Sequence, residues 1–354
     1  MIEFLAEAKL LILKAFSLLS AQLVKVISYP IDEGQRIYWL YLLSSVVFAA
    51  IIYLRQSNNR QSLRDFLRFL FPAAVWRHPS AWLDVRYFFF HQVFRLLIYG
   101  IFLGSVSVGV YAGLVKYFAQ GEALLYGINA DTPNNIFFTI SFVYMFVAIC
   151  ATDFFSYCLH YLQHKNPFLW EFHKVHHSAE VMHPLSNYRE HPFDNLLYAV
   201  GTGGVLGLMA GIFQILFGYV PQMPQIIGVS GIYFLFNILG YNLRHSHIWL
   251  RWPGKLSYLF GSPAHHQVHH SYHPDHINKN FAFIFPWWDA IFGTMAMPED
   301  NRDVKFGISK DYVPEYSTVL QLYYVPILNV IKGLKKKDED ETVATELEKE
   351  FKDK

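Results

Sequence analysis

The chain has 354 residues and a formal net charge of +1; it is 53% hydrophobic, 18% aromatic and only 16% charged. A soluble domain usually carries about 25% charged residues, so the deficit favours a lipid environment over a soluble globular core. The sequence has no basic stripe with interleaved aromatic residues, which argues against nucleic acid as a partner. Cys150 and Cys158 fall in one apolar run, and we interpret them as buried thiols rather than a disulfide framework.

The N-terminal segment 1–36 is predicted to be amphipathic and to lie at the membrane interface. Charged residues interrupt its apolar run at Glu3, Glu7, Lys9 and Lys14. A polar face of this kind suits a helix that lies on a bilayer rather than one that crosses it. No basic leader precedes a small-residue cleavage site, so we expect no cleavable signal peptide.

Five stretches are apolar and long enough to be considered as membrane spans, since a bilayer core of about 30 Å needs roughly 20 apolar residues in a helix. They are residues 37–54, 94–118, 135–159, 196–220 and 225–243. The sequence therefore predicts an all-α membrane bundle of four or five helices. We take residues 37–334 as one membrane-embedded domain, and residues 335–354 as a charged, solvated tail without chemistry.

The connecting segments predict the orientation of the bundle. Segment 119–134 contains no Lys or Arg, whereas segment 55–92 is rich in arginine. By the positive-inside rule, segment 55–92 faces the cytoplasm. Counting the crossings then places residues 160–195, and the chain after Leu243, on the same cytoplasmic side.

Histidines are concentrated in three short segments with helical spacing. The first has the pattern H-x-x-x-H and the other two have the pattern H-x-x-H-H; the residues are His160 and His164, then His173, His176 and His177, then His266, His269 and His270. Positions i, i+3 and i+4 share one helix face, so each segment can aim several imidazoles at one place. Neutral imidazole suits iron, zinc, copper and nickel. Eight histidines exceed the needs of one tetrahedral zinc, which indicates two metals sharing a site.

These three boxes resemble those of the fatty acid hydroxylase/sterol desaturase superfamily of integral-membrane di-iron oxygenases. The resemblance runs from roughly Trp39 to Thr294. It includes the stretches FHKVHHSAE, YREHPFDN, RHSHI, SPAHHQVHH, NKNF and WWDAIFGT. The spacing from His245 to His270 is similar to that of the alkylglycerol monooxygenase branch. The resemblance implies a membrane helical bundle whose cytoplasmic cap holds a di-metal site, with residues 37–334 as the catalytic domain.

The resemblance also assigns roles to single residues. His245 matches a ligand at the cytoplasmic end of the last span, which makes nine expected ligands. Arg189 and His191 match an R-x-H-P element, and Asn278 stands where many relatives carry Asp. We predict that these three residues orient ligands, although direct ligation by His191 remains an alternative.

The other histidines receive weaker predictions. His183 and His247 are candidates for orienting roles, with ligation left open. His78 and His91 are read as satisfied interfacial residues, and His265, His273 and His276 as surface residues. The aromatic residues Trp170, Phe172, Trp287 and Trp288 fit either a substrate entrance or an interfacial belt.

The resemblance implies two iron ions, with zinc as a possible substitute, and O₂ as co-substrate. The expected activity is hydroxylation, desaturation or monooxygenation of a membrane sterol, fatty acyl or ether lipid. An alternative is a membrane metal-binding or electron-transfer protein, but such a carrier would need isolated ligands within the spans. A di-metal hydrolase would usually add carboxylate ligands, which the boxes lack.

Oxygen activation needs electrons, and the chain shows no source of them. It has no G-x-G-x-x-G motif for a nicotinamide or flavin, and two cysteines are too few for an iron–sulfur cluster. We therefore expect an external donor, such as a ferredoxin or cytochrome b₅ with its reductase. The arginines of segment 55–92 form a candidate docking surface for an acidic donor.

Overall fold

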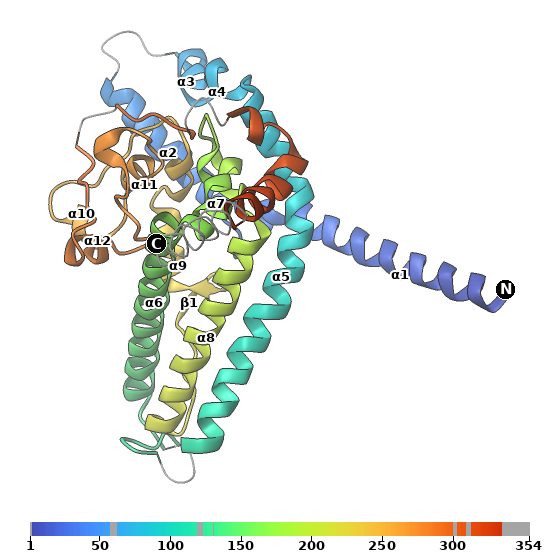
Figure 1. Ribbon diagram of the computed structural model, residues 1–354. Helices are drawn as coiled ribbons and strands as arrows, with labels where there is room; N and C mark the ends of the chain where they lie inside the picture. The colour runs from blue at the N-terminus through green and yellow to red at the C-terminus, as the bar shows by residue number, and fades with distance from the viewer. Residues whose placement is uncertain are drawn as a thin grey trace, which may run out of the picture.

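The computed structural model describes residues 2–56, 62–118, 123–129, 131–299, 303–308 and 313–334. Long helices descend from a cap of short helices and loops, and the N-terminal helix points away from the body (Figure 1). The long helices are α1 (Ile2–Ile27), α2 (Trp39–Gln56), α5 (Pro79–Phe118), α6 (Asn134–Lys165) and α8 (Pro192–Phe217). The charged tail 335–354 lies outside the described residues.

Four helices of the described chain are long and apolar enough to cross a membrane. They are Trp39–Gln56, Ile101–Phe118 within α5, Asn134–Lys165 and Pro192–Phe217. The predicted all-α membrane bundle of four or five helices is therefore confirmed, with four. The helix α1 is not among these spans, and its role at the membrane interface stays a prediction.

Helices α5 and α8 pack closely because α8 carries glycines four residues apart. A Cβ atom on Gly203 would lie only 2.6 Å from the carbonyl oxygen of Leu103 in α5. A Cβ on Gly207 would collide with the carbonyl of Ser107. Small residues at this spacing let two helix backbones approach, as is typical of helix pairs in membranes.

The fifth expected span, residues 225–243, does not form a long helix. Its first part is a short hairpin of β1 (Gln225–Ile226) and β2 (Val229–Ser230), with Gly228 at a φ of +87° in the turn. The helix α9 (Gly231–Ile238) then ends before Gly240, whose φ is +79°. Eight helical residues reach only about 12 Å, too short to cross a bilayer. The chain thus returns to the cap through short elements that glycine conformations interrupt.

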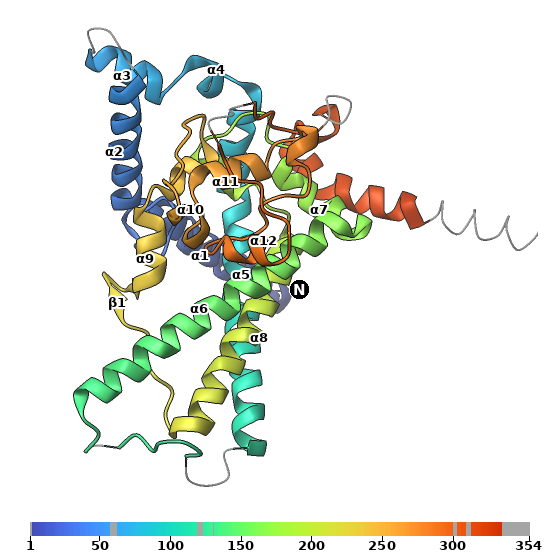
Figure 2. The same ribbon diagram turned by 90° about the vertical axis from the view of Figure 1, so that its left-hand side faces the viewer.

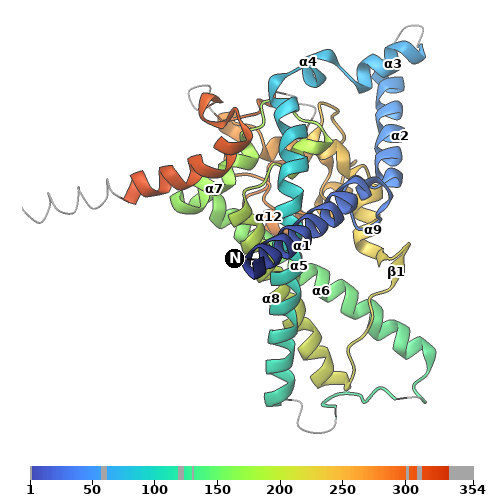
Figure 3. The ribbon, with the colours of Figure 1, turned by 90° about the vertical axis from the view of Figure 1, so that its right-hand side faces the viewer.

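The cap lies at one end of α5, α6 and α8, with α2 beside it, and brings distant segments together (Figure 2). Its short elements are η1 (Tyr29–Ile31), α3 (Leu63–Leu70), α4 (Ala73–Trp76), α7 (Pro167–His177), η2 (Pro184–Tyr188), η3 (Tyr241–His245), α10 (Leu256–Leu259), α11 (Pro263–His269), η4 (Pro274–His276), α12 (Trp287–Ile291) and η5 (Val313–Tyr316). The helix α1 extends sideways, across the direction of α5 (Figure 3). The boxes predicted from sequence all lie in this cap or where it meets α6.

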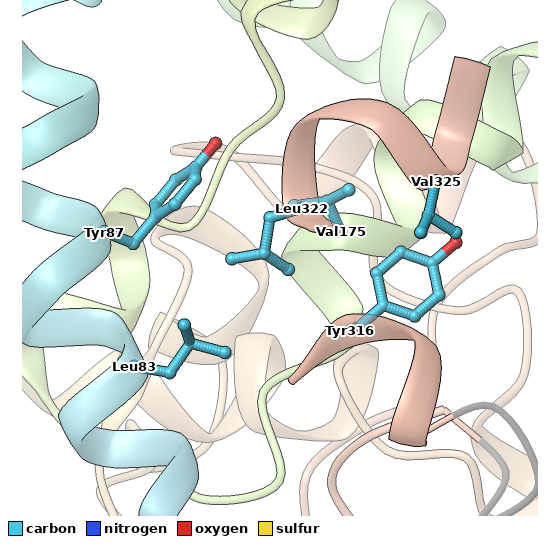
Figure 4. Packing of buried hydrophobic residues seen from close by; sticks show 6 residues of the cluster. All are labelled: Leu83, Tyr87, Val175, Tyr316, Leu322 and Val325. Atoms are coloured by element: carbon cyan, nitrogen blue, oxygen red, sulfur yellow. The ribbon is translucent and has the colours of Figure 1, made fainter. Parts of the chain in front are cut away.

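The last described helix, Val319–Leu334, closes the cap over α5 and α7. Leu322 and Val325 meet Val175 of α7 and Tyr87 of α5 in one buried cluster (Figure 4). Burying side chains of this kind contributes roughly 1.5–3 kcal/mol each. The C-terminal helix therefore holds α7, with its histidines, against the long helix α5.

Candidate metal centre

The nine histidines expected as ligands come together in two adjacent groups. The first histidine group is His160, His164, His173, His177 and His269, and the second histidine group is His176, His245, His266 and His270. Within each group, one nitrogen from each ring lies within 4.8 Å of the corresponding nitrogens of all the others. Among the residues that the structure describes, no other His, Cys, Asp or Glu joins either group.

Helix geometry decides how each box divides between the groups. In α7, His173 and His177 are one turn apart and join the first group, while His176 joins the second. In the third box, His266 and His270 join the second group and His269 the first. The H-x-x-H-H spacing thus places two rings in one group and one in the other. The two boxes do so in opposite senses, so both groups share both boxes.

The distances between ring nitrogens fit a shared cation. His177 Nε2 lies 3.1 Å from His269 Nε2, and His245 Nε2 lies 3.0 Å from His266 Nε2. Two imidazole nitrogens bound at about 2.1 Å and at right angles to each other would be about 3.0 Å apart. The Nε2 atoms of His164 and His173 are buried without any hydrogen-bond partner. Converging, unpaired nitrogens of this kind fit a pair of bound metal ions.

Burial keeps these rings neutral. Desolvation lowers the pKa of His176 to about 4, and it lowers the pKa of His177 and His269 well below 6.5. For His177 and His269 the neighbouring imidazoles lower the pKa further. A neutral ring offers a lone pair to a metal, whereas an imidazolium does not. The site therefore presents ligand-ready nitrogens at neutral pH.

Backbone carbonyls fix the orientation of three rings, because a carbonyl can only accept and the ring Nδ1 must then donate. The pairs are His160 Nδ1 with the Phe281 carbonyl (2.8 Å), His176 Nδ1 with the Arg189 carbonyl (3.1 Å) and His269 Nδ1 with the Lys279 carbonyl (2.9 Å). With the proton on Nδ1, the Nε2 lone pair faces the centre of its group.

Comparison with known proteins gives the context of this geometry. The fatty acid hydroxylase family model matches residues 145–294, a segment that contains all nine histidines. This segment is less than half of the chain, and over it the chain is similar to the fatty acid hydroxylase family. Among curated relatives, an alkylglycerol monooxygenase of Danio rerio is 30% identical over 164 residues, covering 46% of this chain and 32% of the relative.

Other curated relatives resemble the chain at similar distance. An ornithine lipid hydroxylase of Rhizobium tropici is 25% identical over 163 residues, covering 46% of this chain and 45% of the relative. A very-long-chain aldehyde decarbonylase of Oryza sativa subsp. japonica is 28% identical over 149 residues, covering 42% and 52%. The chain therefore spans a third to a half of the length of these relatives. No solved structure matches it.

Arg189, expected to orient a ligand, contacts His176 through its backbone. Its carbonyl accepts from His176, and its guanidinium donates to Asp84 Oδ1 at 2.5 Å. The same guanidinium donates to Ser178 Oγ at 3.1 Å and to the Ser80 carbonyl at 3.0 Å. Asp84 of α5 thus holds Arg189, whose carbonyl in turn orients the ring of His176. Sequence reasoning missed Asp84, because nothing in its local pattern distinguishes it from an interfacial carboxylate.

The side chains of His191 and Asn278 form no hydrogen bond with the nine rings in the described part of the chain, and their orienting role stays a prediction. His191 caps α8, since its Nδ1 accepts from the Phe193 amide at 3.1 Å, and its Nε2 bonds to the Tyr323 carbonyl at 3.1 Å. It joins neither histidine group of the described chain. Asn278 has a left-handed φ of +59°, and the contact to His269 comes from the carbonyl of the next residue, Lys279. Asn278 therefore shapes the turn that presents this carbonyl.

The remaining histidines stay outside both groups, and two of them correct the prediction of surface positions. His265 is buried because its Nδ1 joins a capping box with Ser262 at the start of α11. His276 is also buried. His247 bonds to the Phe69 carbonyl at 2.7 Å, and His183 Nε2 bonds to Asp84 at 3.0 Å.

Two histidines outside the boxes, one within α5 and one just before it, are hydrogen-bonded, as expected. His91 lies between Asn195 Oδ1 (2.7 Å) and the Tyr323 hydroxyl (2.9 Å). His78 Nδ1 accepts from the Ser80 amide at 3.2 Å, where α5 begins. Neither residue belongs to a metal-binding group.

Two buried carboxylates hold the loop that follows the third box. Asp153, the acidic residue inside the third span, accepts from the amides of Ile284 (2.8 Å) and Phe285 (3.0 Å) and from the Trp288 indole (3.2 Å). Asp289 accepts from the Phe281 amide at 2.8 Å. These bonds position the Phe281 carbonyl that orients His160. Trp288 is thereby part of this anchor.

Two cavities reach the histidines from different sides. One, of about 290 Å³, is lined by His164, His177, His269 and His270 together with Trp170 and Asn278. The other, of about 190 Å³, is lined by His160, His173, His176 and His266, and by Ser156 of α6 and Tyr198 of α8. Both histidine groups border each cavity, so a molecule in either cavity is close to both groups.

Proposed function

We propose that this chain is an O₂-dependent oxidoreductase that acts on C–H bonds of a membrane lipid, with two iron ions as its cofactor. The observation that carries the proposal is the pair of histidine groups, in each of which one nitrogen from every ring converges on the same place. In three of the rings, the Nδ1 atom donates to a backbone carbonyl and so fixes the ring. The names of the relatives, which are lipid hydroxylases, monooxygenases and decarbonylases, support a lipid as substrate.

The first histidine group would hold one iron ion and the second histidine group the other. Bound iron would supply reductive activation of O₂, which neither the imidazoles nor any other side chain can perform. The protein's own residues do the rest. The carbonyls of Phe281, Arg189 and Lys279 keep three rings oriented, and seven of the nine rings are buried.

A hydroxylation of this kind has a simple balance. One oxygen atom of O₂ enters the C–H bond as a hydroxyl group, and the other leaves as water with two protons. The two electrons come from an external donor of the ferredoxin or cytochrome b₅ type. Exposed arginines on the cap side of the long helices, Arg64, Arg68, Arg77 and Arg86, are the proposed docking surface for an acidic donor. We propose that this cap faces the cytoplasm.

The test uses the purified full-length protein, reconstituted with iron in nanodiscs of bacterial lipid extract. We expect two iron ions per chain by elemental analysis, and an oxygenated lipid product only when O₂, a reductant and a donor protein are all present. His176→Ala should lose metal and product, whereas the matched control His247→Ala, which lies outside both groups, should keep both. Full activity of His176→Ala, or repeated turnover without reductant, would overturn the proposal.

A further inference from the structure

A separate cavity of about 340 Å³ lies against α2, away from the candidate metal centre. Four parts of the chain form its wall: α2 with the residues just before it, the segment from α3 to α4, the start of η2, and the end of η3 with the residues after it. Helices α2 and α3 stand on the side of the cap opposite α7 (Figure 2). None of the nine histidines is among the described residues that line this cavity. A molecule held here is therefore not in contact with either histidine group.

The wall of this cavity is mostly apolar. Of the sixteen described residues that line it, eleven are apolar and none is Lys, Arg, Asp or Glu. The five polar ones are Ser45, His183, Asn242, Ser246 and His247. A charged headgroup would lose its hydration here without meeting a carboxylate, ammonium or guanidinium partner in the wall. The composition of the wall thus favours an uncharged, largely apolar ligand.

Three of the five polar side chains already bond to the backbone. The hydroxyl groups of Ser45 and Ser246 donate to carbonyl oxygens four and three residues earlier, at 2.9 Å and 2.8 Å. The Nε2 atom of His247 bonds to the Phe69 carbonyl at 2.7 Å. These bonds stabilise the wall and leave Asn242 and His183 as the polar groups that can receive a ligand.

Asn242 and His183 each have one buried polar atom without a partner in the described chain. Asn242 is 3% exposed, and its Nδ2 donates to the Arg36 carbonyl at 2.9 Å, which fixes the orientation of the amide and leaves Oδ1 unpaired. His183 is 1% exposed, its Nε2 bonds to Asp84 at 3.0 Å, and its Nδ1 is unpaired. Leaving a buried polar atom unpaired is unfavourable, so a ligand that brings a hydroxyl group to either atom gains binding free energy.

We propose that this cavity binds the hydroxyl end of an uncharged, straight-chain lipid alcohol, which is a bound lipid and not the substrate. The hydroxyl group donates to Asn242 Oδ1 or to His183 Nδ1, and the alkyl chain contacts the apolar wall. Ionised phosphate and carboxylate groups only accept hydrogen bonds, so they cannot satisfy the amide oxygen. An ammonium group can donate, but it finds no anionic partner in the wall.

The size of the cavity selects a chain over a ring system. An apolar cavity of about 150 Å³ holds benzene with its six carbon atoms, so 340 Å³ holds roughly 13 non-hydrogen atoms by proportion. A twelve-carbon alcohol has this size, whereas a sterol is about twice as large. Helix α2, which forms one wall, is long and apolar enough to cross a membrane. A lipid alcohol can therefore reach the cavity from the bilayer along α2.

The first experiment locates the bound alcohol without requiring turnover. The full-length protein in phosphatidylcholine nanodiscs is photolabelled with a twelve-carbon primary alcohol that carries a diazirine in its chain. The labelled peptides are then identified by mass spectrometry. We expect labels within residues 37–46, 70–76, 182–185 and 242–248, and we expect unlabelled 1-dodecanol to remove them. Labels confined to other lipid-facing surfaces, or to the two cavities of the candidate metal centre, would overturn the proposal.

Competitors of one chain length test the chemistry of the ligand. They are 1-dodecanol, dodecane, dodecyl phosphate and dodecylamine, compared at equal mole fraction in the bilayer. We expect 1-dodecanol to compete at about a tenfold lower mole fraction than dodecane, as one buried hydrogen bond implies. The phosphate and the amine should both compete more weakly than 1-dodecanol. Equal competition by dodecane, or stronger competition by the phosphate or the amine, would contradict the proposed ligand.

Variants assign the binding to this cavity. Val46 lines the cavity and Val47 is exposed beside it on α2, so labelling should fall at least about tenfold in Val46→Trp and stay unchanged in Val47→Trp. Asn242→Leu and His183→Phe each remove one unpaired atom, and the advantage of 1-dodecanol over dodecane should disappear in one of them. Undiminished labelling of Val46→Trp, or an advantage that survives in both other variants, would overturn the assignment. If these variants fail to fold, the ranking of competitors on the wild-type protein decides.

The His176→Ala variant separates this inference from the proposed function. That variant is expected to lose metal and product, but its labelling by the photoreactive alcohol should equal that of the parent protein. Equal labelling without lipid oxidation by the parent protein would count against the proposed function and support this site. Loss of the label together with the metal would show that the alcohol binds at the candidate metal centre, which would overturn this site.

Discussion

The first histidine group and the second histidine group use the same box spacing but differ in what supports their rings. In the first group, the outer nitrogens of His160 and His269 donate to backbone carbonyls, and His173 faces Asp194. In the second group, His176 also donates to a carbonyl, but His245 faces the Ser186 hydroxyl, 2.8 Å away.

The difference is sharpest at His266 of the second group. The guanidinium of Arg244 donates to its Nδ1 at 3.0 Å. Burial lowers the pKa of Arg244 only to about 10, so it remains a cation at neutral pH. A neutral His266 that accepts at Nδ1 carries its proton on Nε2, which faces His245 and His270. The two groups therefore differ at His266, whose Nδ1 faces a cation, whereas the outer nitrogens of the other oriented rings face a carbonyl, a carboxylate or a hydroxyl.

The largest expected effect comes from removing one ring from each group. His177→Ala should leave the first group without its metal, and His270→Ala should do so for the second group, because each group has only four or five nitrogens. We expect one metal per chain in each variant by elemental analysis, with lipid oxidation lost in both. If both variants kept two metals, the division into two groups would be wrong.

The pH dependence of the metal-free protein is the next largest effect. Burial lowers the pKa of both His176, in the second group, and His91, outside both groups, to about 4. Between pH 6.5 and about 4, each of these two rings is protonated in the unfolded chain but neutral in the folded protein. The contribution of each neutral ring to the free energy of unfolding is therefore fully present above pH 6.5 and is lost as the pH falls towards 4. The loss is about 3 kcal/mol per ring, at 1.36 kcal/mol per pKa unit.

Thermal unfolding of the metal-free protein between pH 7.5 and 4.5 measures this loss. His176→Gln and His91→Gln should each flatten the pH dependence by a similar amount, because the two rings have similar pKa values although only one belongs to a group. If the unfolding temperature of the parent protein did not change over this pH range, the conclusion that these rings are buried and neutral would be wrong.

A smaller effect is expected from the carboxylates behind the two groups. Asp84 fixes Arg189, whose carbonyl orients His176 of the second group, and Asp289 fixes Phe281, whose carbonyl orients His160 of the first. Loss of such support typically costs about 10–100-fold in metal affinity or activity. We expect Asp84→Asn to weaken metal binding at the second group and Asp289→Asn at the first.

Metal titration in the His177→Ala and His270→Ala backgrounds assigns each effect to its group, and the exposed Asp65→Asn serves as control. If Asp84→Asn instead lowered the metal affinity of the first group, the proposed support of His176 by Asp84 through Arg189 would be wrong.

The smallest effect is the order in which a chelator removes the metals. Because His266 faces a guanidinium, the second group should release its metal first, at roughly a tenfold lower chelator concentration, the low end of the effects of altered ligand support. Stepwise chelation followed by elemental analysis measures the order, with His177→Ala and His270→Ala identifying each step. Release of the first group's metal before the second would contradict the distinction between the groups.

Much of the candidate site follows from local helix geometry, which is written in the spacing of residues. The intervals i, i+3 and i+4 bring His173 and His177 to one side of α7 and His176 to another, whatever the rest of the chain does. The apolar runs likewise predicted the four helices of the described chain that are long and apolar enough to cross a membrane. The run 225–243 failed as a helix because glycine conformations and burial in the cap outweighed its composition.

Only the tertiary structure decided which groups stand behind each ring. Every residue has a backbone carbonyl, so the sequence does not distinguish those of Phe281, Arg189 and Lys279. Only packing selects these three as partners of the rings. Packing likewise brought Asp84 to Arg189 across more than a hundred residues and placed Asp194 beside His173. Spacing along a helix is a short-range property that a sequence carries directly. The pairing of a ring with a distant carbonyl or carboxylate depends on how the whole cap closes over α5, α6 and α8.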